Sequence, residues 1–145
     1  MTGTGHDITT RADIERLVDA FYAQVRADEI LAPIFDDAAH TDWAHHLPKM
    51  YDFWETVLCG ASAYRGQPIG IHVELATRVP LGEREFGRWL TLFVATVDAA
   101  FLGPQADEAK RRAARIASVM QHHIRSAAAG PAAATVGPAV APLEP

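Results

Sequence analysis

The chain has 145 residues, 49% of them hydrophobic, and a formal net charge of -5. This length and composition predict one domain with a substantial core, and the acidic balance argues against a nucleic-acid-binding surface, which needs clustered Lys and Arg. The single cysteine, Cys59, excludes an internal disulfide framework. The sequence has no run of about 18 apolar residues, so no membrane span is predicted. Its polar start lacks the apolar core of a signal peptide, so we expect a cytoplasmic protein.

Residues 1–8 are expected to form a polar N-terminal leader, and the first helix follows it. Thr10 and Asp13 resemble a capping box, with Asp in place of the usual Glu. Apolar residues then recur every three or four positions at Ile14, Leu17, Val18, Phe21 and Val25. This period predicts a helix that ends near Asp28. The stretch "APIF" (32–35) is expected to be a short turn that carries Phe35.

A second stripe with helical spacing occupies residues 43–58. Its members are Trp43, His46, Leu47, Met50, Trp54, Val57 and Leu58. Pro48 interrupts the stripe, and proline fits the first turn of a helix but disrupts its interior. We therefore expect this helix to begin near Leu47, with residues 43–46 in a preceding turn, and Gly60 to end it.

The middle of the chain is irregular, and two strong helices follow it. Residues 61–82 show no long periodic segment, although 69–76 can form two helical turns around His72. An aromatic-rich stripe predicts a helix after Gly82 that ends at "GP" (103–104), and a last helix covers about 105–127. Residues 128–145 are rich in Ala and Pro, so we expect a disordered tail. The fold class is all-α, with one domain over 9–127; an irregular middle segment inside it suggests a functional role.

Among seven histidines, His46 and His72 stand out because each lies among apolar residues. A packed core histidine is the simplest interpretation of either one. A zinc or iron site built from His40, Asp42, His45 and His46 is the metal-site alternative, but the chain lacks both the H-E-x-x-H spacing and a cysteine pair. The sequence contains no G-x-S-x-G motif, so it does not indicate a serine hydrolase.

Large aromatics at helical spacing give a second interpretation of these histidines. They can form an ordinary core, or they can line a pocket for a large planar ligand. Haem fits the latter, because the porphyrin supplies four nitrogen ligands and a single neutral imidazole completes the set. His72, with no other ligand-type residue at ordinary spacing, suits that arrangement.

Four blocks of the sequence occur in the order and spacing of a known family. They are "FYAQVRADEILAPIF" (21–35), "HLPKMYDFWETVL" (46–58), "YRGQPIGIH" (64–72) and "FGRWLTLF" (86–93). Over about residues 8–126 the chain resembles the truncated haemoglobins of group III. The absence of any Gly-Gly pair, a feature of groups I and II, agrees with that group.

The resemblance implies a two-over-two helical globin fold around haem b and gives each site residue a role. His72 matches the proximal iron ligand. The distal ligand-binding residues are Tyr22, His46 and Trp89, with His46 able to swing between pocket and solvent. Residues expected to line the haem pocket are Phe35, Met50, Phe53, Trp54 and Phe93. Candidates for binding the propionates are Lys49, Arg65 and Arg78.

The resemblance also implies a function. We expect reversible binding of O₂, NO or CO at a five-coordinate haem iron, serving redox chemistry or oxygen binding rather than bulk transport. NO dioxygenase activity and peroxidase-like activity are both left open, and either would need an electron donor that is not identified. The sequence does not decide whether the protein is an enzyme or a binding protein. We expect a monomer without nucleic-acid or membrane partners. The alternatives are a cofactor-free helical interaction module and the histidine-rich metal enzyme described above.

Overall fold

The computed structural model describes residues 5–60 and 66–129, without the side chains of residues 37 and 38. Within these residues the ordered elements are all helical. They are α1 (Arg11–Arg26), the short π-helical turn η2 (Ile34–Ala38), α2 (Trp43–Cys59), α3 (Pro68–Leu75), α4 (Glu83–Ala100) and α5 (Pro104–Ala128). The predicted all-α class is therefore confirmed. The tail beyond residue 129 and Arg65 lie outside the described residues.

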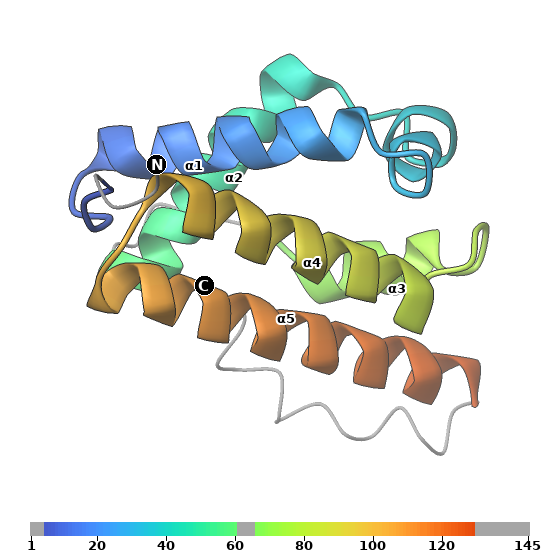
Figure 1. Ribbon diagram of the computed structural model, residues 1–145. Helices are drawn as coiled ribbons and strands as arrows, with labels where there is room; N and C mark the ends of the chain where they lie inside the picture. Colours follow the sequence, from blue (N-terminus) through green and yellow to red (C-terminus); the bar gives the residue numbers. More distant parts are fainter. Residues whose placement is uncertain (1–4, 61–65, 130–145) are drawn as a thin grey trace.

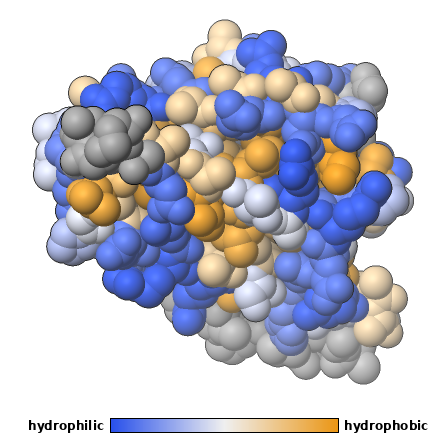
Figure 2. All heavy atoms as spheres, in the orientation of Figure 1, coloured by the Kyte–Doolittle hydropathy of each residue, from blue (hydrophilic) through white to orange (hydrophobic). Residues whose placement is uncertain are grey.

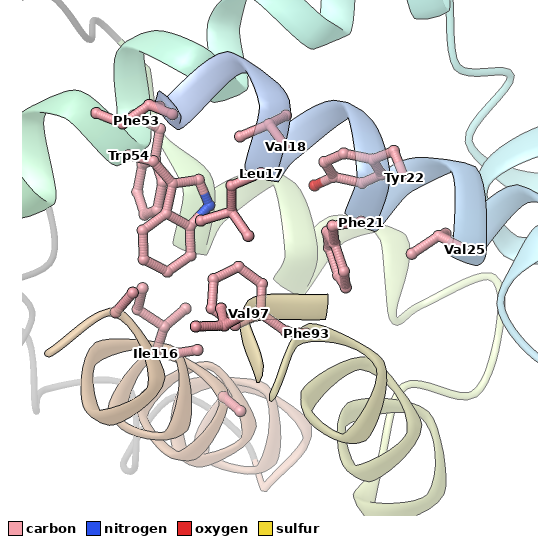
Figure 3. Packing of buried hydrophobic residues seen from close by; sticks show 14 of the residues in the cluster. Leu17, Val18, Phe21, Tyr22, Val25, Phe53, Trp54, Phe93, Val97 and Ile116 are labelled. Atoms are coloured by element: carbon pink, nitrogen blue, oxygen red, sulfur yellow. The ribbon is translucent and has the colours of Figure 1, made fainter. Parts of the chain in front are cut away.

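Helices α1 and α4 run side by side, with α2 behind α1 and α5 next to α4 (Figure 1). The short α3 packs against α5. Figure 3 shows how the core fills the space between these helices: Phe21 of α1 faces Phe93 of α4, and Trp54 of α2 lies beside them. Phe21 and Phe93 are almost completely buried. Burial of such large rings is a major source of the stability of a small helical domain.

The predicted start of α1 is confirmed in detail. The Thr10 hydroxyl accepts a hydrogen bond from the Asp13 N–H at 3.1 Å, and the Asp13 carboxylate accepts one from the Thr10 N–H, also at 3.1 Å. This reciprocal capping satisfies two backbone donors at the helix end. The apolar stripe of α1 that was predicted from its spacing is buried.

The predicted start of α2 was wrong. The helix begins at Trp43 rather than near Leu47, and Pro48 lies inside it. The first turn forms because the Asp42 carbonyl accepts hydrogen bonds from the N–H groups of His45 (3.0 Å) and His46 (2.8 Å). Pro48 has no N–H and cannot donate a helix hydrogen bond, which destabilises this turn. The stacking of the Trp43 ring on Phe35 stabilises the turn and offsets that loss. Gly60 ends the helix with a left-handed φ of 73°, as predicted.

Residues 5–8, expected to precede the domain, are packed onto it. Ile8 is 1% exposed and belongs to the core. The Leu102 N–H donates to the His6 carbonyl at 3.0 Å. Asp7 accepts hydrogen bonds from the backbone N–H groups of Gln105 (3.0 Å) and Ala106 (2.8 Å) at the start of α5. This segment therefore links the beginning of α1 to the corner between α4 and α5.

The face seen in Figure 2 combines a hydrophilic rim with hydrophobic side chains that reach the surface near its centre. The large hydrophobic side chains with the greatest exposure among the described residues are Ile71 (58%) and Leu102 (63%). In the described part of the chain, no helix is both long and apolar enough to cross a membrane.

Candidate haem site

His72 lies in α3, the helix predicted around it, and its imidazole is oriented by the helix's first turn. Pro68 occupies the first helical position, where its fixed φ favours the helix and its missing N–H costs nothing. His72 Nδ1 lies 2.6 Å from the Pro68 carbonyl oxygen. A carbonyl can only accept, so Nδ1 carries the proton and Nε2 keeps its free electron pair. This backbone partner is the one expected for a metal-ligating imidazole.

The charge state of His72 also suits a metal ligand. Burial lowers its pKa below the ordinary value, and this effect exceeds the opposing effect of the Pro68 carbonyl. The ring is therefore neutral at pH 7. A neutral imidazole with its proton on Nδ1 presents Nε2 as a ligand for iron.

His46 projects from the first half of α2. Burial lowers its pKa to about 4, with smaller effects from the nearby His72, Lys49 and His45, so it is also neutral at pH 7. His46 and His72 come from different helices, α2 and α3. Among the described residues, no group forms a hydrogen bond with the buried Nε2 of His46.

Aromatic rings surround His46 on several sides. The centroid of its ring lies 5.3 Å from that of Tyr22, 5.5 Å from Trp43 and 6.2 Å from Phe35. Tyr22 in turn contacts Trp43 at 5.4 Å and Phe35 at 5.9 Å. Helices α1 and α2 and the turn η2 thus build one aromatic wall, which brings the predicted distal residues Tyr22 and His46 together.

Trp43 is a member of this wall that the sequence prediction missed. It was placed in a turn before the helix, whereas its ring contacts Tyr22, Phe35 and His46 from the first turn of α2. The Arg26 guanidinium lies 4.8 Å from the centroid of the ring, in cation–π geometry. The signal was present in the sequence, because Trp43 precedes His46 by three positions on the same apolar stripe.

Trp89, the third predicted distal residue, reaches the wall through Phe21. Its ring centroid lies 5.7 Å from Phe21, which contacts Tyr22 at 4.9 Å. On its other side Trp89 stacks with Phe93 at 5.8 Å, and Phe93 stacks with Trp54 at 4.7 Å. A continuous series of rings therefore connects the distal residues with the core.

The other residues predicted to line the pocket lie on the same helices. Phe53 and Trp54 are buried in α2, with ring centroids 5.5 Å apart. Met50 is half-buried, one turn after His46, and packs against the core. Phe35 is half-buried in η2. Helices α1 and α2 and the turn η2 therefore present mostly apolar side chains around His46, which suits a large apolar ligand.

The cations proposed for the propionates lie in different settings. Lys49 is exposed on α2. Arg78 pairs with Glu74 at 3.0 Å and lines a cavity of about 860 Å³ between the η2 segment and the α3–α4 connection. The residues around this cavity are Glu29, Ile30, Pro33, Ile34, His40, Arg78, Val79, Pro80, Arg84 and Glu85. Neither His46 nor His72 is among them, so these histidines do not line the cavity.

The histidine-rich metal alternative finds no support in the described residues. Among them, no three or more His, Cys, Asp or Glu side chains are grouped so that they could hold a metal ion. His40, Asp42 and His45 are exposed, whereas His46 points into the aromatic wall. The side chains that are close in sequence therefore diverge in space.

Comparisons with known proteins agree with this geometry. A family model described as bacterial-like globin matches residues 6–126. The group 3 truncated haemoglobin of Campylobacter jejuni is 34% identical over 112 residues, which cover 75% of this chain and 86% of that protein. The crystal structure of the group III truncated haemoglobin from Campylobacter jejuni matches with a TM-score of 0.73 at 30% identity, over 83% of this chain and 95% of that one. The truncated globin fold is thereby confirmed, and the chain belongs to the group III truncated haemoglobins, a family of haem-binding globins.

Proposed function

We propose that the chain holds haem b through Nε2 of His72 and binds O₂, NO or CO on the opposite side, next to Tyr22, His46 and Trp89. The observation that carries the proposal is the Nδ1 contact of His72 with the Pro68 carbonyl, which leaves Nε2 available for iron. Attachment by coordination alone, as in haem b, agrees with a sequence that has one cysteine and hence no C-x-x-C-H motif. Bound haem supplies an iron centre to which a small gas molecule can bind.

The distal residues provide hydrogen-bond donors in an otherwise apolar setting. Tyr22 and Trp89 carry an O–H and an N–H, and their rings are held by contacts with Phe21. A donor that is fixed in a dry site stabilises a partially charged ligand more than a mobile donor in water does. Slow release of O₂ follows, and it suits redox chemistry on small molecules better than bulk oxygen transport.

The proximal side favours gas binding over peroxidase-like turnover. The partner of His72 Nδ1 is a neutral carbonyl, and a carboxylate in that position would make the imidazole a stronger electron donor. NO dioxygenase activity stays within the proposal, because it needs bound O₂ and a source of electrons. The electron donor, the cytoplasmic location and the monomeric state are further expectations that rest on the sequence.

Arg78 is our preferred propionate-binding residue, together with its neighbours around the cavity that it lines. That cavity combines apolar walls from Ile34 and Val79 with the cations Arg78 and Arg84 and the imidazole of His40. A haem edge has the same mixed character, with an apolar ring and two carboxylates. The exposed Lys49 belongs to the same helix as His46 and is the second choice.

Gas titration of the reduced, haem-loaded protein tests the proposed function. We expect CO and O₂ each to shift the Soret band reversibly, with one gas molecule bound per chain. The matched comparison is the Tyr51→Phe variant, which removes a hydroxyl whose hydrogen-bond partner is Asp19. A reduced protein whose spectrum does not respond to CO would exclude gas binding. The cofactor-free alternative is not retained, because the family of this chain binds haem.

A further inference from the structure

The Trp43 ring contacts each of the other rings of the aromatic wall. Its centroid lies 5.4 Å from that of Tyr22, 5.5 Å from that of Phe35, on which it stacks, and 5.5 Å from that of His46. Tyr22 and His46 also contact each other, at 5.3 Å. Because protein interiors are closely packed, a displacement of the indole would remove a packing partner from both of these distal side chains at once.

Two exposed charged residues from other elements hold the same indole. Arg26, in the last turn of α1, places its guanidinium carbon 4.8 Å from the centroid of the Trp43 ring, in cation–π geometry. Asp36, in η2, accepts a hydrogen bond from the indole N–H at 3.4 Å. Trp43 itself is half-buried, whereas Tyr22 is buried. The indole therefore connects the buried distal ring with charged groups at the surface.

The first turn of α2, which carries both Trp43 and His46, has weak anchors within its own helix. In the part of the chain that the structure describes, the Asp42 side chain makes no capping hydrogen bond, and the turn is joined to this residue by bonds such as that from the His46 N–H to the Asp42 carbonyl, at 2.8 Å. Pro48 has no N–H, so the bond that would join it to the Ala44 carbonyl is missing. A helix end with few such bonds opens locally more easily than the helix interior. The contacts of the indole with other elements therefore matter for keeping this turn closed.

We infer that Trp43 is a positioning residue, which fixes the rings of Tyr22 and His46 on the distal side of the site. This inference rests on the proposed function and deepens it. The contacts of the indole with Arg26 and Phe35 keep the first turn of α2 closed. Trp43 acts through the two side chains that it orients, and it needs no contact with the bound gas. Donors that are held in place in a dry site stabilise a partially charged ligand more than mobile donors in water do.

Two measurements on the haem-loaded protein saturated with CO test this inference. The exchange rates of the amide hydrogens of His45 and His46 report whether the first turn of α2 is closed, because both N–H groups donate to the Asp42 carbonyl. The infrared C–O stretching band reports how the distal donors are placed against the bound gas, which a purely structural role of Trp43 would not change.

We expect Trp43→Ala to speed exchange of these two amides about tenfold or more, since it removes several ring contacts together. We expect the same variant to shift or split the C–O band, because Tyr22 and His46 lose their fixed orientation. Trp43→Phe keeps a ring that can stack on Phe35, so it should recover most of the wild-type exchange rates and most of the wild-type C–O band.

Arg26→Gln isolates the cation–π contact through a change at the surface, and it keeps the inference testable if Trp43→Ala does not fold. Exchange of the His45 and His46 amides should become about two to five times faster, the factor that corresponds to one exposed cation–π contact. Arg16→Gln is the matched control. The Arg16 guanidinium carbon lies 5.1 Å from the centroid of a different ring, that of Phe101, so this variant should keep the wild-type exchange rates of the two amides.

A folded Trp43→Ala variant with the exchange rates or the C–O band of the wild type would overturn the inference. Equal acceleration of the two amides in Arg26→Gln and Arg16→Gln would also overturn it, because the effect would then come from global stability. Either result leaves the proposed function intact as long as the reduced wild type binds CO. A wild type that does not bind CO would instead refute the proposed function itself.

Discussion

The hydroxyl of Tyr22 offers a sharp test of the distal side, because it can be removed without changing the packing of the ring. The ring contacts Phe21, Phe35, Trp43 and His46 at centroid distances between 4.9 Å and 5.9 Å. Tyr22→Phe keeps all four contacts and deletes only the donor. A hydrogen bond to a charged or partially charged partner contributes about 1.5–3 kcal/mol, which corresponds to about a tenfold to 150-fold change in a rate constant.

We therefore expect O₂ to dissociate from Tyr22→Phe about ten to 150 times faster than from the wild type. Stopped-flow mixing of the oxygenated protein with excess CO measures this rate. Tyr51→Phe is the matched control, because it loses a hydroxyl whose partner is Asp19 on the outer side of α1. An off-rate for Tyr22→Phe within twofold of the wild type would refute the role of the hydroxyl and transfer it to Trp89 or His46.

Two further predictions concern the parts of the fold that hold the site. Burial alone would raise the pKa of Asp28, but hydrogen bonds from Arg88, Leu31 and Ile30 hold it below its ordinary value. A depressed folded-state pKa means that the stabilisation is complete above the unfolded value of about 3.9 and is lost as the pH falls through the folded pKa. We expect Asp28→Asn to lower the free energy of unfolding by about 1–3 kcal/mol at pH 7, with the difference from wild type shrinking below about pH 4; parallel stability–pH curves in urea unfolding would contradict this. Gly103 has φ 143° and ψ -178°, and a β-carbon there would lie 2.5 Å from Asp7 Cγ, so Gly103→Ala should cost about 1–3 kcal/mol. Gly87→Ala, in an open position of α4, should instead gain about 0.5–1 kcal/mol, and equal melting temperatures for the two variants would argue against this account of Gly103.

Most of the helical fold could be predicted from local patterns in the sequence. The stripe of α1 and its capping box depend on residues within a few positions of one another, and both were predicted correctly. The same holds for the end of α2 at Gly60 and for the short helix around His72. Spacing, caps and glycine are local signals, and local interactions determine these features.

The start of α2 could not be predicted because a distant contact outweighs a local rule. Proline at position 48 argued for a helix that begins next to it. The stacking of Trp43 on Phe35 and the cation–π contact with Arg26 come from other parts of the chain, and they stabilise the earlier turn. The helical spacing from Trp43 to His46 allowed the earlier start, but spacing alone does not show these two contacts, which outweigh the effect of the proline.

The candidate site was predicted in part. The sequence singled out His46 and His72 by their apolar neighbours, and the structure brings His46 together with Tyr22, another residue predicted on the distal side. The Pro68 carbonyl as partner of His72 Nδ1 follows from helix spacing, since the two residues are four positions apart. The absence of a hydrogen-bond partner for Nε2 of His46 among the described residues could not be predicted from the sequence, because it depends on how rings from α1, α2 and η2 pack together.

The identity of the proximal ligand is the central claim, and a haem titration tests it most directly. The comparison uses His46→Leu with and without the added change His72→Ala, so that His46 cannot replace the missing ligand. We expect His46→Leu to bind haem in a one-to-one ratio with a sharp Soret band, and the double variant to bind it weakly, with the band restored by free imidazole. Tight one-to-one binding by the double variant, with the spectrum of His46→Leu, would contradict the assignment of His72 as the iron ligand.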